Sequence, residues 1–106
     1  MTDKLFNRLW QDALVQPKEE LFIGEYGYPD WFDDISTDAA VVVETLQKIH
    51  HAAHMTIDEL VKESGSIGNL CNKFCVPRST VCGWLYENKK CPDYVRLAFA
   101  RGLGLI

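Results

Sequence analysis

The chain has 106 residues, 47% of them hydrophobic, and a formal net charge of −4, which excludes a disordered chain and allows one domain with a real core. No apolar run approaches the length of a membrane span, and Asp3, Asn7 and Gln11 argue against a signal peptide, so we expect a cytosolic protein. Residues 1–66 hold 5 Lys/Arg and 13 Asp/Glu, whereas residues 67–106 hold 6 and 2, so the second part is basic enough to suit phosphate contact.

The first predicted element is an amphipathic helix over residues 3–16. Its apolar residues follow helical spacing, and Pro17 ends it. Such a stripe is typical of a core or a dimer surface rather than of a ligand site. The stripe consists of Leu5, Phe6, Leu9, Trp10, Ala13 and Leu14.

Residues 18–35 allow two interpretations. Residues 19–23 fit a short helix or a short strand, and Gly24 and Gly27 then break the run. Aromatic residues gather next among several acids, either as a partner-binding surface or, as we prefer, as a plug that seals one end of a small core. The cluster consists of Tyr26, Tyr28, Trp31, Phe32 and Ile35.

A longer helix is predicted next. Ser36 or Thr37 would cap it, with Asp38 in the first turn, where negative charge is favourable. The helical period of its apolar residues overrules the strand propensity of the three consecutive valines. That apolar face comprises Ala39, Val42, Val43, Leu46, Ile49, His50 and Ala53.

Three histidines, His50, His51 and His54, lie at the end of this helix. His50 and His54 are four residues apart, a spacing that can hold a metal, but no carboxylate pattern such as H-E-x-x-H accompanies them. We therefore interpret them as helix-end residues, because a protonated histidine is favourable near a helix C-terminus.

A short helix is predicted to start at Thr56. Thr56 and Glu59 form a capping box, and the apolar residues that follow face inward. Ser64 and Gly65 end this helix, and Ser66 or its neighbour starts the next one.

Two further short helices are predicted on either side of a tight turn. In the first, Leu70, Cys71 and Phe74 form an apolar face. Pro77 is tolerated only at a helix start, so it opens the second helix. In that helix the inward face is Val81, Trp84 and Leu85, with Trp84 in the core. The few polar residues left outside lie near its N-terminus, which is the shape of a helix that can enter a DNA major groove.

The last predicted helix starts at Pro92 and ends at Gly102 and Gly104. Residues 103–106 then form an apolar tail, which is either tucked into the core or shared with a second copy. The apolar face of this helix is predicted to comprise Tyr94, Val95, Leu97, Ala98 and Phe99.

Residues 56–101 resemble the phage-repressor type of helix-turn-helix domain, the lambda repressor, Cro and xenobiotic response element family. The segment LCNKFCVPRSTVCGWLYENKKCPDY, residues 70–94, carries the resemblance. Two positions depart from the family pattern: Ile67 stands where a glutamine usually holds a phosphate, and Cys75 stands at a turn position that often needs φ > 0. The matching residues are Phe74, Val76, Pro77, Thr80, Val81, Trp84, Pro92 and Tyr94.

The resemblance implies double-stranded DNA as the partner. Arg78 would read the edge of a base, with guanine expected, unless it instead pairs with an acid such as Glu63. Small and aromatic residues of the same helix would line the groove, and lysines would hold phosphates. The groove residues would be Ser79, Thr80, Gly83 and Tyr86, and the phosphate contacts Lys73, Lys89 and Lys90.

Neither a metal site nor an enzyme is predicted. The four cysteines, Cys71, Cys75, Cys82 and Cys91, include no C-x-x-C pair, and in a cytosolic chain disulfides are not expected. No catalytic pairing or glycine-rich phosphate loop is present, so we expect no cofactor.

The sequence therefore predicts an all-α protein of five to six helices in a single compact domain. Residues 1–55 would be a helical extension packed on a helix-turn-helix unit over residues 56–106. The predicted function is a sequence-specific transcriptional regulator of phage, mobile-element or antitoxin type, as a possible homodimer. The alternative is a protein-interaction module, for example a phage-encoded inhibitor, which binds a protein through its acidic N-terminal half. For the acidic residues themselves we prefer the simpler interpretation, a solvated face.

Overall fold

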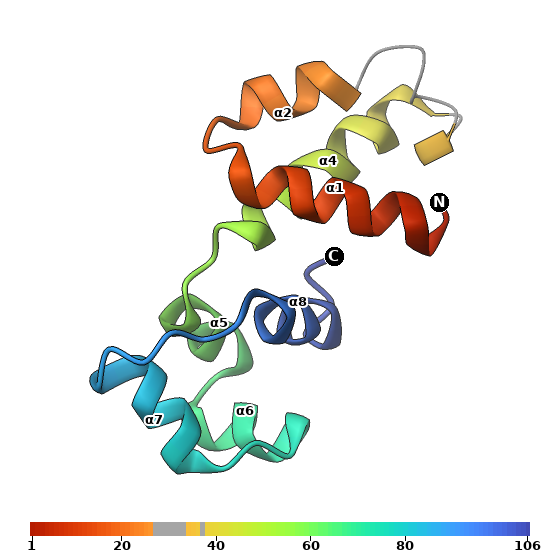
Figure 1. The fold of residues 1–106 in the computed structure, drawn as a ribbon. Helices are drawn as coiled ribbons and strands as arrows, with labels where there is room; N and C mark the ends of the chain where they lie inside the picture. The colour runs from red at the N-terminus through yellow and green to blue at the C-terminus, as the bar shows by residue number, and fades with distance from the viewer. Residues whose placement is uncertain (27–33, 37) are drawn as a thin grey trace. The chain divides into compact units, whose positions relative to one another are not determined.

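The computed structural model describes residues 1–26, 34–36 and 38–106. Within these ranges the chain forms seven α-helices and no strand, so the all-α prediction is confirmed, while the helix count exceeds the predicted five to six (Figure 1). Contacts between Cα atoms divide the chain into two compact units. Unit 1 holds Met1–His54 together with Ile106, and unit 2 holds Met55–Leu105.

Unit 1 is built on α4, against which both α1 and α2 pack. Helix α1 spans Asp3–Val15 and is capped by Thr2, whose hydroxyl accepts a hydrogen bond from the Leu5 amide at 3.1 Å. Helix α2 spans Glu19–Tyr26 and settles the ambiguous segment as helix. The prediction that Gly24 breaks this run is wrong, because Gly24 lies inside α2.

Helix α4 spans Ala39–Ala53, and its cap is Asp38 rather than Ser36 or Thr37. The Asp38 carboxylate accepts a hydrogen bond from the Ala40 amide at 2.9 Å, which satisfies one of the free amides of the first turn. Ser36 instead accepts a hydrogen bond from the Asp38 amide at 3.2 Å. Thr37 lies outside the described residues.

The core of unit 1 joins all three helices. Tyr26 is fully buried and donates a hydrogen bond through its hydroxyl to the Asp12 carboxylate of α1. Of the predicted aromatic cluster, Tyr26 and Ile35 are buried, and the other members lie outside the described residues. The buried apolar side chains include Phe6, Leu9, Trp10, Ala13, Phe22, Val42, Leu46 and Ile49.

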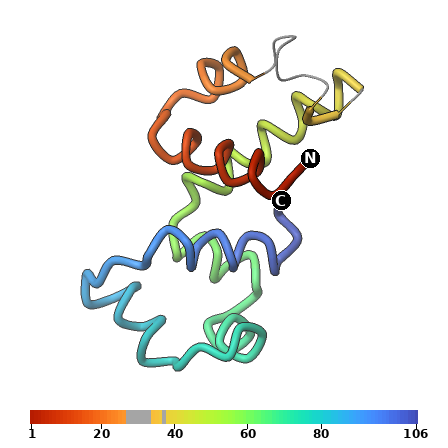
Figure 2. The backbone as a smooth tube through the Cα atoms, turned by 45° about the vertical axis from the view of Figure 1, so that its right-hand side comes forward, coloured from red at the N-terminus to blue at the C-terminus, as the bar shows by residue number. Residues whose placement is uncertain are grey.

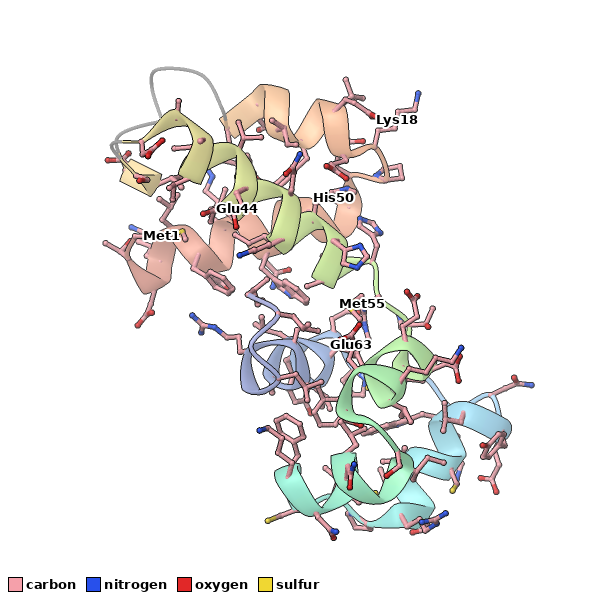
Figure 3. The ribbon with its side chains drawn as sticks, turned by 180° about the vertical axis from the view of Figure 1, so that it is seen from behind. Met1, Lys18, Glu44, His50, Met55 and Glu63 are labelled. Carbon is pink, nitrogen blue, oxygen red and sulfur yellow. The ribbon has the colours of Figure 1, made fainter. Side chains whose placement is uncertain are left out.

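Two of the three histidines complete the C-terminus of another helix. The ring nitrogen Nε2 of His50 lies 2.7 Å from the carbonyl oxygen of Gln16, and that of His54 lies 2.7 Å from the carbonyl oxygen of Ala13. The two rings are 4.4 Å apart at their centroids, and Figure 3 labels His50 on α4. They lie at the end of α4, as expected, but their partners are the last carbonyls of α1.

Unit 2 consists of four short helices, with α5 in contact with the other three. They are α5 at Ile57–Ser64, α6 at Ile67–Phe74, α7 at Arg78–Tyr86 and α8 at Asp93–Gly102; Figure 2 traces their path. The predicted capping box is present, with the Thr56 hydroxyl accepting from the Glu59 amide and the Glu59 carboxylate accepting from the Thr56 amide. The core includes Leu60, Leu70, Val81, Phe99 and Ala100.

The apolar face of α8 differs from the prediction. Tyr94 is 74% exposed and Ala98 is also exposed, whereas Phe99 and Ala100 are buried. Arg96 lies on the inner side, where its guanidinium donates to the Met55 carbonyl at 2.8 Å and to the Asp93 carboxylate at 2.7 Å. Arg96 thus ties α8 to the chain that enters α5.

Candidate functional site

The candidate site is the pair α6 and α7 with the turn between them. Ser66 caps α6 by accepting a hydrogen bond from the Asn69 amide at 3.1 Å. The turn residue Cys75 has φ 55°, so this position does require the left-handed region, and a cysteine adopts it. The Cys71 carbonyl closes the turn by accepting from the amides of Cys75 and Val76.

Apolar contacts hold this pair of helices on the rest of unit 2. Leu70 of α6 and Val81 of α7 are completely buried. The Phe74 ring lies 4.7 Å from the Phe99 ring of α8 and the Trp84 ring lies 6.1 Å from it, between centroids. Trp84 therefore faces inward as predicted, although it is half-buried rather than fully enclosed. The buried side of α7 fixes which side chains remain outside.

The first turn of α7 is the exposed part of the pair. Pro77 is its N-cap and offers no side-chain acceptor, while its carbonyl accepts from the Thr80 amide at 3.0 Å. Arg78, Ser79 and Thr80 are all exposed, which is where the sequence placed them. A cation and two hydroxyls thus stand at the positive end of a helix, a place that attracts anions.

Arg78 is not held by a carboxylate within the described part of the chain. The alternative pairing with an acid such as Glu63 is absent there, since the ion pairs among described residues involve other cations. The guanidinium is therefore available for an external acceptor. Arginine is suited to that role because its planar fork can bond two acceptors at once.

Gly83 is placed differently from the other predicted groove residues. It is buried, because the side chain of Lys89 folds back over it, and a Cβ built at Gly83 would lie 3.2 Å from Lys89 Cδ. Lys89 also forms an ion pair with Glu87, with 3.3 Å between Nζ and Oε2. The prediction treated Lys89 as a free loop residue, whereas its side chain lies along α7.

Cys82 is a candidate site residue that was not predicted from the sequence. At 3.6 residues per turn, Arg78, Cys82 and Tyr86 recur every four residues and share one side of α7. Cys82 is half-exposed and Tyr86 is 72% exposed, so this side is open along its length. The four-residue spacing of Arg78, Cys82 and Tyr86 was the signal in the sequence, but Cys82 was considered there only for a metal site or a disulfide.

The remaining predicted phosphate contacts are exposed. Lys73 lies in the last turn of α6, and Lys90 lies in the loop between α7 and α8. Residues 67–106 carry 6 basic and 2 acidic side chains, while α5, which contacts α7, adds Asp58, Glu59 and Glu63 against Lys62, so unit 2 has a small net positive charge. A positive surface around an exposed helix start is electrostatically suited to a polyanion.

The cysteines and the other ligand types form no rival site in the described ranges. All four cysteines are free thiols, and burial raises the pKa of Cys91. No three His, Cys, Asp or Glu side chains gather there as potential metal ligands. Among the described helices, none is both long and apolar enough to cross a membrane.

Comparisons of the chain with protein-family models, with curated proteins and with solved structures found no match.

Proposed function

We propose that the chain is a sequence-specific DNA-binding protein of the helix-turn-helix class, acting as a small transcriptional regulator of phage, mobile-element or antitoxin type. One observation carries the proposal. Arg78, Ser79 and Thr80 are exposed together in the first turn of a helix whose opposite side is fixed by the buried Val81. A helix presented in this way can place its N-terminal residues against base edges in the major groove.

In this proposal each exposed residue has a defined role. Arg78 donates two hydrogen bonds to O6 and N7 of a guanine, and the hydroxyls of Ser79 and Thr80 bond to neighbouring bases or phosphates. Cys82 lies one turn further along the same side and contacts the groove in place of the buried Gly83. Lys73 and Lys90 neutralise phosphates and add affinity without sequence preference.

The decisive comparison is Arg78→Ala against Lys90→Ala, measured by gel shift on a duplex selected from a random library and on random duplex DNA. Arg78→Ala should cost about 1–3 kcal/mol on the selected duplex and less on random DNA. Lys90→Ala is the matched control and should weaken both duplexes by the same factor. Equal losses for both variants on both duplexes would remove the base-reading role of Arg78.

A second candidate, a protein-interaction module on the same scaffold, has its own support. Unit 1, taken as residues 1–54, holds 4 Lys/Arg and 10 Asp/Glu and leaves Val15 81% and Leu21 57% exposed. Ile67, at the start of α6, cannot hold a phosphate as the glutamine of the resembled family does. A wild-type chain that fails to shift any duplex at low salt would favour this candidate.

A further inference from the structure

The loop that follows α7 is folded back onto the helix rather than extended into solvent. The Gly83 carbonyl accepts two amides at once, from Glu87 at 3.1 Å and from Lys89 at 3.2 Å. Asn88, between them, has φ 56°, which reverses the chain. These two hydrogen bonds hold the backbone of the loop against α7 at Gly83.

The side chains of the loop follow the backbone. Lys89 lies over Gly83, where an ideal Cβ would be 3.2 Å from Lys89 Cδ and 3.9 Å from its Nζ. Glu87 lies at the same place, with Oε2 3.6 Å from that Cβ position and 3.3 Å from Lys89 Nζ. Gly83 therefore provides the space in which the Glu87–Lys89 pair lies against the helix.

We infer that Glu87 neutralises Lys89, so that this loop contributes one phosphate contact, from Lys90, rather than two. This inference rests on the proposed DNA binding. Both side chains of the pair are well exposed, so the pair itself adds little stability. Its effect is on the charge that approaches DNA: the pair is neutral as a unit, and any phosphate that Lys89 attracts is repelled by Glu87. Lys90 has no such partner among the described residues.

The experiment is the salt dependence of binding to random duplex DNA, measured with the full chain between about 50 and 200 mM salt, because the slope counts neutralised phosphates. Glu87→Gln should steepen the slope by about one contact, since it releases Lys89. Glu87→Gln/Lys89→Ala should return to the wild-type slope, since a neutral pair is replaced by a neutral pair. Lys90→Ala should flatten the slope by about one contact.

Glu44→Gln is the matched control, because Glu44 is also an exposed acid paired with a lysine, Lys48 at 2.9 Å, but lies on α4 of unit 1. It changes the net charge equally and should leave the slope unchanged. The inference is overturned if Glu87→Gln leaves the slope unchanged while the double variant flattens it, because Lys89 would then contact phosphate on its own. A wild-type chain that binds no duplex at low salt overturns the proposed function, and this inference with it.

Discussion

Gly102 of α8 lies against the ring of Phe74 from α6. A Cβ at this position would lie 2.3 and 2.5 Å from two ring atoms of Phe74, and that ring packs against the Phe99 ring at an interplanar angle of 50°. The ring cannot yield without disturbing the core of unit 2. Gly102→Ala should therefore lower the free energy of unfolding by about 1–3 kcal/mol, as overpacking does, measured by urea denaturation followed by circular dichroism.

Gly24→Ala is the control for that measurement, because Gly24 also lies in a helix but has nothing within 4 Å of its Cβ position. Alanine is the better helix former, so this variant should be stabilised by up to about 1 kcal/mol. Similar effects for the two glycines would mean that Phe74 does not pack against Gly102.

Tyr26 gives unit 1 a pH dependence at the alkaline end. Burial, together with the hydrogen bond to Asp12, raises the pKa of Tyr26 to about 12. Below pH about 10 both folded and unfolded chains keep the phenol proton, and between about 10 and 12 only the unfolded chain loses it. Stability should therefore fall across that window, by at most roughly 3 kcal/mol.

Tyr26→Phe isolates the contribution of this phenol, because it removes the hydroxyl and keeps the ring. Urea denaturation at several pH values should show a smaller loss of stability above pH about 10 in the variant than in the wild type. Identical pH profiles would show that Tyr26 is not buried against Asp12.

At the scale of the elements, the carbonyl groups at the C-terminus of α1 are hydrogen-bonded by histidine side chains from the end of α4. His50 is 6% exposed, lies beside Phe22 and bonds the Gln16 carbonyl. His50→Ala should leave that carbonyl with only the longer contact to His54 Nε2, at 3.1 Å, and open a gap next to Phe22, at a cost of about 1–3 kcal/mol in urea denaturation. His51→Ala, on the exposed side of the same turn, should change stability by less than about 0.5 kcal/mol. Equal losses would refute the capping role.

Local rules predicted most elements, and the errors arise either from local signals that compete or from long-range contacts. Thr56 and Glu59 cap α5, and Ser66 caps α6. These contacts lie within one helical turn, so they could be predicted from residue spacing alone. The cap of α4 was misplaced by one or two residues, because Ser36, Thr37 and Asp38 are all good caps and sequence alone does not rank them.

In the candidate site, too, local features were predicted and features that depend on distant residues were not. The exposed start of α7 was predicted from Pro77 and the apolar period, both of which are local signals. The burial of Gly83 was not predicted, because it depends on a loop residue six positions later that folds back onto the helix. The inward turn of Arg96 was missed for a similar reason, since its acceptor is the carbonyl of Met55, 41 residues earlier.

At the scale of the whole molecule, the structure removes two of the reasons for predicting self-association. The apolar stripe of α1 was a candidate dimer surface, but Phe6, Leu9, Trp10 and Ala13 are buried, and α1 packs on α4. The C-terminal tail is folded against α8, with the Leu105 amide donating to the Ala100 carbonyl at 2.9 Å. Leu103 and Leu105 are half-buried, so neither surface is a free apolar face.

We therefore expect two copies to meet on DNA rather than in its absence. On the proposed function, each copy reads one half-site, and two copies fit a duplex whose half-sites are about 34 Å apart, one helical turn. Sedimentation velocity should give a monomer for the free chain and two chains per duplex at that spacing. A duplex with the half-sites shifted by half a turn is the control, because it turns the second copy to the opposite side of the DNA and should lose any cooperativity. A dimer without DNA would show that another surface joins the copies. Val15 and Leu21, the most exposed of the large aliphatic side chains in the described part of the chain, would then be tested by Val15→Asp and Leu21→Asp.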